Sequence, residues 1–161
     1  MKPNYVVIPA IVIVTAVVGS RFVNAGMEWY RTIHLPAITP PGWFIGVVWN
    51  VIFVLTTISA ILVWNRAPHR GQFWAIVVLF LVNAVLNAMW SYVFFVEHAI
   101  GGAIVEMLVL LATVLAMIVL IRPISILAAE LLIPYAAWVG FATYLTTEIW
   151  RLNKVAGGNS I

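Results

Sequence analysis

One face of a strongly apolar stretch in the middle of the chain carries two amides and two aromatic rings. Asn83, Asn87, Trp90 and Phe94 follow one another at spacings of four, three and four residues. These spacings place all four side chains on one side of an α-helix. Amides at membrane depth are costly unless they find partners, so this face is expected to point into a helix bundle. It is either a contact between helices or one wall of a ligand cavity.

Two other apolar stretches present comparable faces. One carries Trp49 and Phe53, and the other carries Tyr135, Trp138 and Ala142. Aromatic walls with small residues between them suit a flat, apolar ligand, through burial of area and offset stacking. We predict that the three mid-stretch tryptophans face one shared pocket; the alternative is that these indoles only fill space.

Glu106 is the remaining chemical candidate, because it lies within an apolar stretch where an ionised carboxylate is expensive. We expect it to be protonated or paired with an amide, and we count it among the pocket residues. Hydrolase and nucleotide-binding motifs are missing from the sequence, as are cysteine and aspartate. His34, His69 and His98 fall in three separate connections, so no metal site is expected.

Five apolar runs must position these side chains. Each run is longer than the about 20 residues that a helix needs to cross a bilayer. The mean hydropathy of the chain is +1.11, and 8% of its residues are charged. The runs are continuous, which indicates helices and not the alternating strands of a barrel. We therefore predict an all-α membrane protein: a five-transmembrane-helix bundle forming one domain (residues 1–153), with a polar tail (154–161). The runs cover residues 1–23, 43–64, 73–96, 99–121 and 125–150.

The first connection, residues 20–42, is much longer than the others. A long, aromatic and proline-rich loop in a compact protein predicts a lid, and an interfacial anchor is the alternative. Lysine and arginine are divided equally between the two sides, so no orientation is predicted, and the net charge of +3 gives no reason to expect nucleic-acid binding. The candidate lid residues are Trp29, Tyr30, Arg31, His34, Pro40 and Pro41.

Three blocks of this sequence resemble those of the translocator protein family, also called the tryptophan-rich sensory protein or TspO/MBR family. The match covers about residues 28–153, with the motifs in the same order and on the expected helices. The first block is Trp29-Tyr30, Pro36, Pro40-Pro41-Gly42-Trp43 and Trp49; the second is Leu86-Asn87, Trp90 and Phe94-Phe95; the third is Pro134-Tyr135, Ala137-Trp138, Phe141-Ala142-Thr143 and Leu145.

This resemblance implies a membrane sensor or scavenger that binds a porphyrin such as protoporphyrin IX, or a benzodiazepine-site ligand, with no obligatory cofactor. It also implies a link to tetrapyrrole or stress regulation. The alternatives are light-dependent porphyrin degradation involving Trp90 and Trp138, and transport of small amphipathic solutes. The implied pocket contains Trp49, Asn87, Trp90, Trp138 and Ala142 under the first loop, where Arg31 and His34 could pair with the propionates, and Glu106 falls where the family often has an acid.

Departures from the animal members favour a bacterial-type member in the bacterial inner membrane. Ala88 stands where animal and many bacterial members have a tryptophan, and Tyr144 lies seven residues before Arg151. The animal cholesterol-recognition pattern needs a closer pair, so cholesterol is not an expected partner. Many family members are dimers, and the small-residue ridges Gly42/Gly46 and Ala84/Ala88 predict a homodimer here.

Overall fold

The structure, a computed structural model, describes residues 3–67 and 71–157, and every regular element in these ranges is helical. Five segments are long and apolar enough to cross a membrane, the last being Ile126–Val155, which combines two helices. The predicted five-helix membrane bundle is thus confirmed. His69 and residues 158–161 lie outside the described residues. The helices are α1 (Asn4–Tyr30), α2 (Gly42–Arg66), α3 (Gly71–Phe95), α4 (Ile100–Ile121), α5 (Ile126–Glu130) and α6 (Ile133–Gly157).

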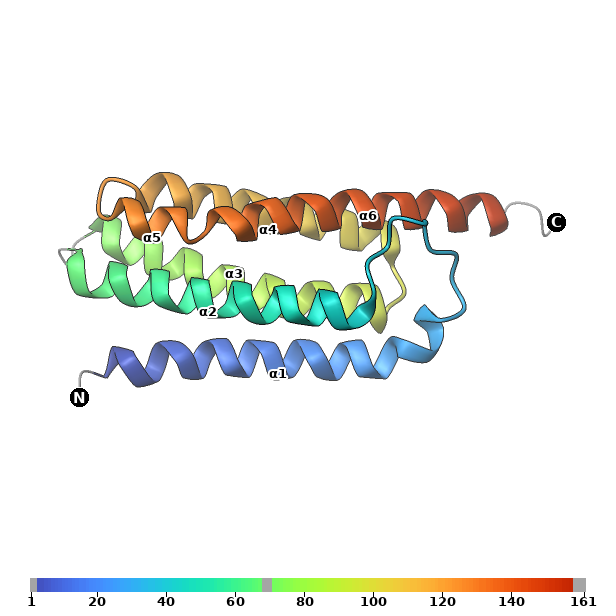
Figure 1. Cartoon of the computed structure of the whole chain (residues 1–161), viewed down its shortest axis with the longest axis horizontal. Coiled ribbons are helices and arrows are strands. Elements are labelled where there is room, and N and C mark those ends of the chain that lie inside the picture. The colour runs from blue at the N-terminus through green and yellow to red at the C-terminus, as the bar shows by residue number, and fades with distance from the viewer. Residues whose placement is uncertain (1–2, 68–70, 158–161) are drawn as a thin grey trace.

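The helices stack in three layers (Figure 1). α1 forms one outer layer, α2 and α3 form the middle, and α4, α5 and α6 form the other outer layer. The closest packing joins α1 to α3, α3 to α4, and α4 to α6. α2 rests on α1 and α5 but approaches α3 only sparsely. The two helices of the middle layer, α2 and α3, therefore pack less closely on each other than α3 packs on α1 and α4.

α1 continues well past the end of the first apolar run, because it packs along α3. Gly26 is buried against Phe95, and a β-carbon at position 26 would lie 1.9 Å from the Phe95 carbonyl oxygen. No proline interrupts residues 20–30, and a helix satisfies its own backbone hydrogen bonds. The prediction that Trp29 and Tyr30 lie in a loop is therefore wrong: both belong to the last turn of α1. The connection shortens to residues 31–41, here called the roof loop.

The fifth run contains a break. Ser125 caps α5 by accepting a hydrogen bond from the Ala128 amide at 3.3 Å, and α6 begins one residue before Pro134. Proline lacks the amide hydrogen that a helix interior needs, but its fixed φ suits a first turn. The Ser59 hydroxyl donates to the Ala128 carbonyl at 2.7 Å and joins α5 to α2. At the other end, α6 continues to Gly157, into the predicted tail.

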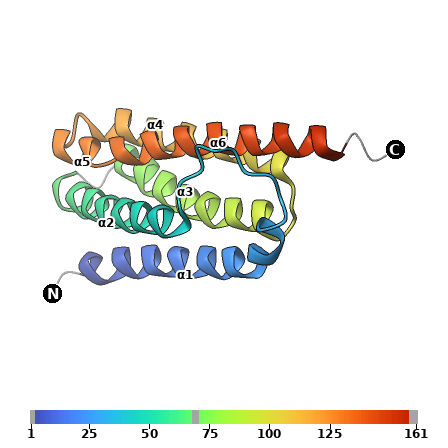
Figure 2. The same ribbon diagram turned by 45° about the vertical axis from the view of Figure 1, so that its right-hand side comes forward.

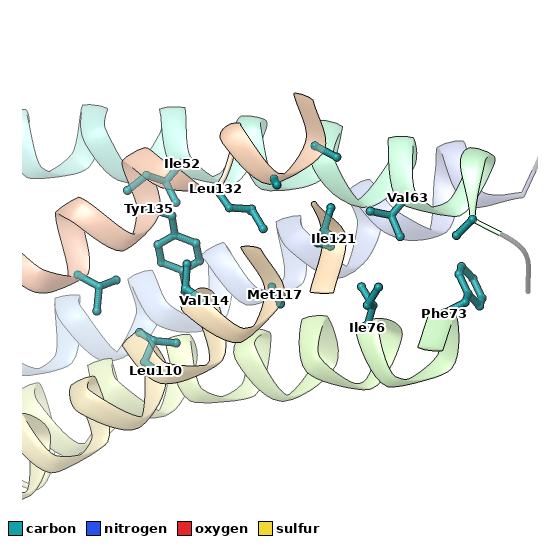
Figure 3. Packing of buried hydrophobic residues seen from close by; sticks show 14 of the residues in the cluster. Ile52, Val63, Phe73, Ile76, Leu110, Val114, Met117, Ile121, Leu132 and Tyr135 are labelled. Atoms are coloured by element: carbon teal, nitrogen blue, oxygen red, sulfur yellow. The ribbon is translucent and has the colours of Figure 1, made fainter. Parts of the chain in front are cut away.

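The buried core runs along α4 and fills the end of the bundle near α5. Figure 3 shows side chains from α2, α3, α4 and the α5–α6 region meeting there. Burial of this kind contributes about 1.5–3 kcal/mol for each large apolar side chain in water; inside a membrane, close packing supplies most of the gain. The α4 members of this core are Leu110, Val114, Met117 and Ile121.

A short turn joins α3 to α4 and makes them an antiparallel pair. His98 in this turn has a φ of 56°, a left-handed conformation uncommon for residues other than glycine. Its imidazole stacks on the Trp29 indole, with ring centroids 4.1 Å apart and an interplanar angle of 17°. The end of α1 is thus held against the α3–α4 turn.

Candidate ligand cavity

A cavity of about 740 Å³, here called the main cavity, occupies the half of the bundle nearest the roof loop. The second half of α1, the first half of α2, the end of α3 and the middle of α6 surround it. Cavities of 300–1,000 Å³ with mostly apolar walls are typical of sites for drug-sized ligands. The main cavity therefore has the dimensions of a ligand site, and it lies inside the membrane-spanning part of the protein.

Tryptophans from three helices line this cavity. Trp49 comes from α2, Trp90 from α3 and Trp138 from α6. Trp90 stacks on Phe94, with centroids 5.6 Å apart and planes 22° apart. The indole nitrogens of Trp90 and Trp138 are buried without a hydrogen-bond partner among the described residues. Each of these two indoles thus keeps a buried donor without a partner.

A hydrogen-bonded network closes the cavity in the middle of the bundle. The Asn87 amide donates to the Tyr135 hydroxyl at 3.0 Å, and this hydroxyl donates to the Asn83 carbonyl oxygen at 3.0 Å. The Asn83 amide then donates to the Thr113 hydroxyl at 2.9 Å, and Thr113 donates to the Leu110 carbonyl at 2.7 Å. Buried polar groups that satisfy one another in this way hold α3, α4 and α6 in fixed positions.

A second and smaller cavity of about 130 Å³ lies beyond this network, and we call it the inner chamber. It is bounded by the first half of α1, the second half of α2 and the first two-thirds of α3. Thr15, Phe53 and Asn87 line both cavities. The two spaces therefore follow one another along the bundle and meet at these three side chains.

The roof loop covers the open end of the main cavity and is attached to α6. The Asn153 side chain accepts a hydrogen bond from the His34 backbone amide and donates one to the His34 carbonyl, both at 3.0 Å. Figure 2 shows the loop passing beside α6 before it enters α2. Leu35, Pro36, Thr39, Pro40 and Pro41 contribute the loop's part of the cavity lining. The loop has the position expected of a lid.

The structure brings together most of the residues predicted for a pocket. Trp49, Phe53, Asn87, Trp90, Phe94, Trp138 and Ala142 all line the main cavity, and so do Tyr30, Pro40 and Pro41 from the predicted lid. Asn83 and Tyr135 line the inner chamber instead, and they reach the main cavity only through Asn87. Whether any of these residues touches a ligand remains a prediction.

Glu106 is not a wall of either cavity, contrary to the prediction. It lies on α4, which packs against α3 and α6 and contributes no residue to either cavity. Both carboxyl oxygens are buried and have no hydrogen-bond partner among the described residues. Among the described residues, Glu106 therefore does not pair with an amide as predicted.

Three predicted lid residues lie away from the cavity lining. Trp29 packs on His98 and, edge to face, on Phe94, because it belongs to a helix end and not to the loop. Arg31 and His34 are exposed at the start of the roof loop. These two residues can meet only the part of a ligand that reaches the rim.

α1 supplies a wall that the sequence analysis did not include. Ala16, Gly19, Val23 and Met27 line the main cavity. Their spacings of three, four and four residues place them on one helical face. This shared face, together with the amide of Asn24 and the ring of Tyr30 on the same helix, is the signal that could have identified the wall.

Three of the four small residues in the ridges predicted to form a dimer line cavities inside the bundle. Gly42 and Gly46 line the main cavity, and Ala84 lines the inner chamber. These ridges therefore give no support to an interface between subunits, and dimerisation stays an untested prediction.

The family model described as the TspO/MBR family matches residues 6–151 of the chain. The chain belongs to this family. The TspO/MBR chain is 36% identical over 126 residues to the tryptophan-rich protein TspO of Bacillus cereus, covering 78% of this chain and 80% of the relative. It is 37% identical over 139 residues to the human translocator protein, covering 84% and 82%. It is 30% identical over 131 residues to protein CrtK of Rhodobacter capsulatus, covering 78% of each.

The five spans and the bacterial relatives indicate a multi-pass integral protein of the bacterial inner membrane. The matched region contains every residue that this TspO/MBR chain places at the main cavity. The cavity is therefore built entirely from the part of the chain that the family shares.

Proposed function

We propose that this TspO/MBR chain is a membrane receptor that binds a porphyrin, such as protoporphyrin IX, in the main cavity. It would act as a sensor or scavenger of tetrapyrroles. The observation that best supports this is the meeting of Trp49, Trp90 and Trp138 around one space of about 740 Å³. Flat rings offset-stack on such walls, and burial of their apolar area favours binding.

The roof-loop end is the part of the cavity that suits the propionate groups of a porphyrin. Carboxylates are expensive to bury without partners, and this end lies beside exposed Arg31. An exposed arginine–carboxylate pair contributes about 1 kcal/mol or less. Arg31→Ala should therefore weaken binding only modestly, by at most about fivefold.

A titration of the purified protein with protoporphyrin IX, followed by tryptophan fluorescence, tests the proposal. Ala142 lines the main cavity, whereas Ala137 of the same helix is exposed on its outer side. Ala142→Leu should weaken binding at least about tenfold by filling the cavity, and Ala137→Leu should bind as wild type. A benzodiazepine-site ligand should compete with the porphyrin. Equal affinities for both variants and wild type would overturn the proposal.

A second function, light-dependent degradation of the bound porphyrin, is supported by one specific observation. Trp90 and Trp138, whose indoles are readily oxidised, line the same space that would hold the macrocycle. The reactive chemistry would come from the illuminated porphyrin and dioxygen, and the protein would supply position and an apolar enclosure. This function depends on the first one, because a protein that does not bind the porphyrin cannot direct its oxidation.

A further inference from the structure

The inner chamber contains an unused hydrogen-bonding group. Thr56 of α2 lines it, and its hydroxyl oxygen is buried without a partner among the described residues. The adjacent Thr57 shows the usual solution, since its hydroxyl donates to the Phe53 carbonyl one turn earlier, at 2.7 Å. A buried hydroxyl that makes no hydrogen bond is unfavourable. Thr56 is therefore suited to a partner that comes from outside the chain.

Most other polar side chains of the chamber make hydrogen bonds within the chain. Asn83, Asn87 and Tyr135 bond to one another, and the Thr15 hydroxyl donates to the Ile11 carbonyl at 3.0 Å. The remaining lining is aliphatic or aromatic. The chamber thus offers a mostly apolar space in which the Thr56 hydroxyl has no partner among the described residues.

We propose that the inner chamber is a second binding site, for a compact apolar molecule that carries one hydroxyl or carbonyl group. An engineered apolar cavity of about 150 Å³ binds benzene, and this chamber measures about 130 Å³. The space therefore fits a single small ring or a short branched chain. The ligand's oxygen bonds to the Thr56 hydroxyl, and its apolar body fills the chamber. This site is too small for the porphyrin and is independent of the proposed function.

The chamber can be reached from the bilayer. Three of its lining residues are exposed on the outside of the bundle: Val7 by 52%, Ile11 by 37% and Leu81 by 45%. In a membrane that surface faces lipid tails, where small phenols and similar amphiphiles accumulate. The ligand therefore arrives dissolved in the membrane, and it need not pass the roof loop.

Fluorine NMR with 4-fluorophenol and fluorobenzene tests this site, with the purified protein in detergent and empty micelles as the reference. We expect saturable, protein-dependent shifts for both probes. Relative to its partition into micelles, the phenol should bind about threefold to tenfold tighter, as one net hydrogen bond provides. Thr56→Val, which keeps the shape and removes the hydroxyl, should abolish this preference and leave fluorobenzene binding intact.

Two further variants locate the site. Ala60 lines the inner chamber and Ala142 lines the main cavity. Ala60→Leu should eliminate saturable binding of both probes, and Ala142→Leu should leave it unchanged. Shifts that do not saturate, that survive Ala60→Leu or that disappear with Ala142→Leu would each overturn the proposal. If Ala60→Leu does not fold, the nearly isosteric variant Thr56→Val tests the site by itself. If Thr56→Val still binds the phenol more tightly than fluorobenzene, to the same extent as wild type, the proposed site is rejected.

Discussion

Gly26 of α1 lies so close to Phe95 of α3 that a β-carbon at position 26 would sit 1.9 Å from the Phe95 carbonyl oxygen. A backbone carbonyl at the end of a helix cannot move aside as a flexible side chain can. Gly26→Ala should therefore push α1 away from α3 and destabilise the protein by about 1–3 kcal/mol, as overpacking does.

Thermal unfolding in detergent, followed by circular dichroism, measures this effect. Gly140 is the matched control, because it also lies within a helix and a β-carbon there would meet nothing within 4 Å. Gly140→Ala should be neutral or slightly stabilising, since alanine favours the helix over glycine. If both variants melt at the same temperature, the close packing of α1 on α3 does not limit stability.

The network between the two cavities should also determine stability. Tyr135→Phe removes the hydroxyl that accepts from Asn87 and donates to Asn83, leaving two buried amide groups short of a partner. Each orphaned buried group costs about 1–3 kcal/mol. Tyr144→Phe, at a residue 54% exposed, is the control and should unfold as wild type. Identical melting curves for both variants would show that the network adds no stability.

Asn153 should control how often the roof loop leaves α6. Asn153→Ala removes both hydrogen bonds to the His34 backbone and a third to the Ile149 carbonyl at 2.8 Å. Loss of the two bonds to the loop, at about 0.5–1.5 kcal/mol each, should speed trypsin cleavage after the exposed Arg31 several-fold.

Asn65→Ala, at the far end of α2, is the matched control for this cleavage. Asn65 bonds to Asn4 and Tyr5 of α1 and does not touch the roof loop. Its substitution should leave cleavage at Arg31 unchanged. Equal cleavage rates in wild type and Asn153→Ala would mean that other contacts hold the loop.

Light should separate binding from degradation. Trp138→Phe keeps an aromatic wall and should retain micromolar-range porphyrin binding, but it should slow the light-dependent loss of the porphyrin absorption band. Trp90→Phe should also slow this loss, whereas Trp74→Phe, at a residue that is 52% exposed, should leave its rate unchanged. If all variants and wild type bleach at the rate of free porphyrin in detergent, the protein only binds its ligand.

The apolar runs were sufficient to predict the five spans, because a backbone inside a membrane must satisfy its own hydrogen bonds and few arrangements do so. The end of α1 was not predictable in the same way. Hydropathy marks where lipid tails end, but the helix continues through Trp29 and Tyr30, since Gly26 allows it to pack on α3. That contact joins residues far apart in sequence, so no local pattern reports it.

The cavity could be predicted where its walls carry rings and amides, as at Trp90 and Trp138. The same reasoning failed for Glu106, because spacing shows which residues share a face but not which helix lies opposite. α4, which carries Glu106, packs against α3 and α6 and lines neither cavity. The wall from α1 was missed for a different reason: Ala16, Gly19, Val23 and Met27 share one helical face but include no ring or amide.

α4 borders neither cavity, yet it contributes the fully buried row from Leu110 to Ile121. This buried row of α4 is thus separate from the side chains that line the two cavities. If the proposed sites bind ligands, changes at Ala142 or Thr56 would alter what the protein recognises while this row stays intact. Specificity would then diverge without loss of the α4 packing, and the two cavities would remain coupled through Thr15, Phe53 and Asn87, which line both.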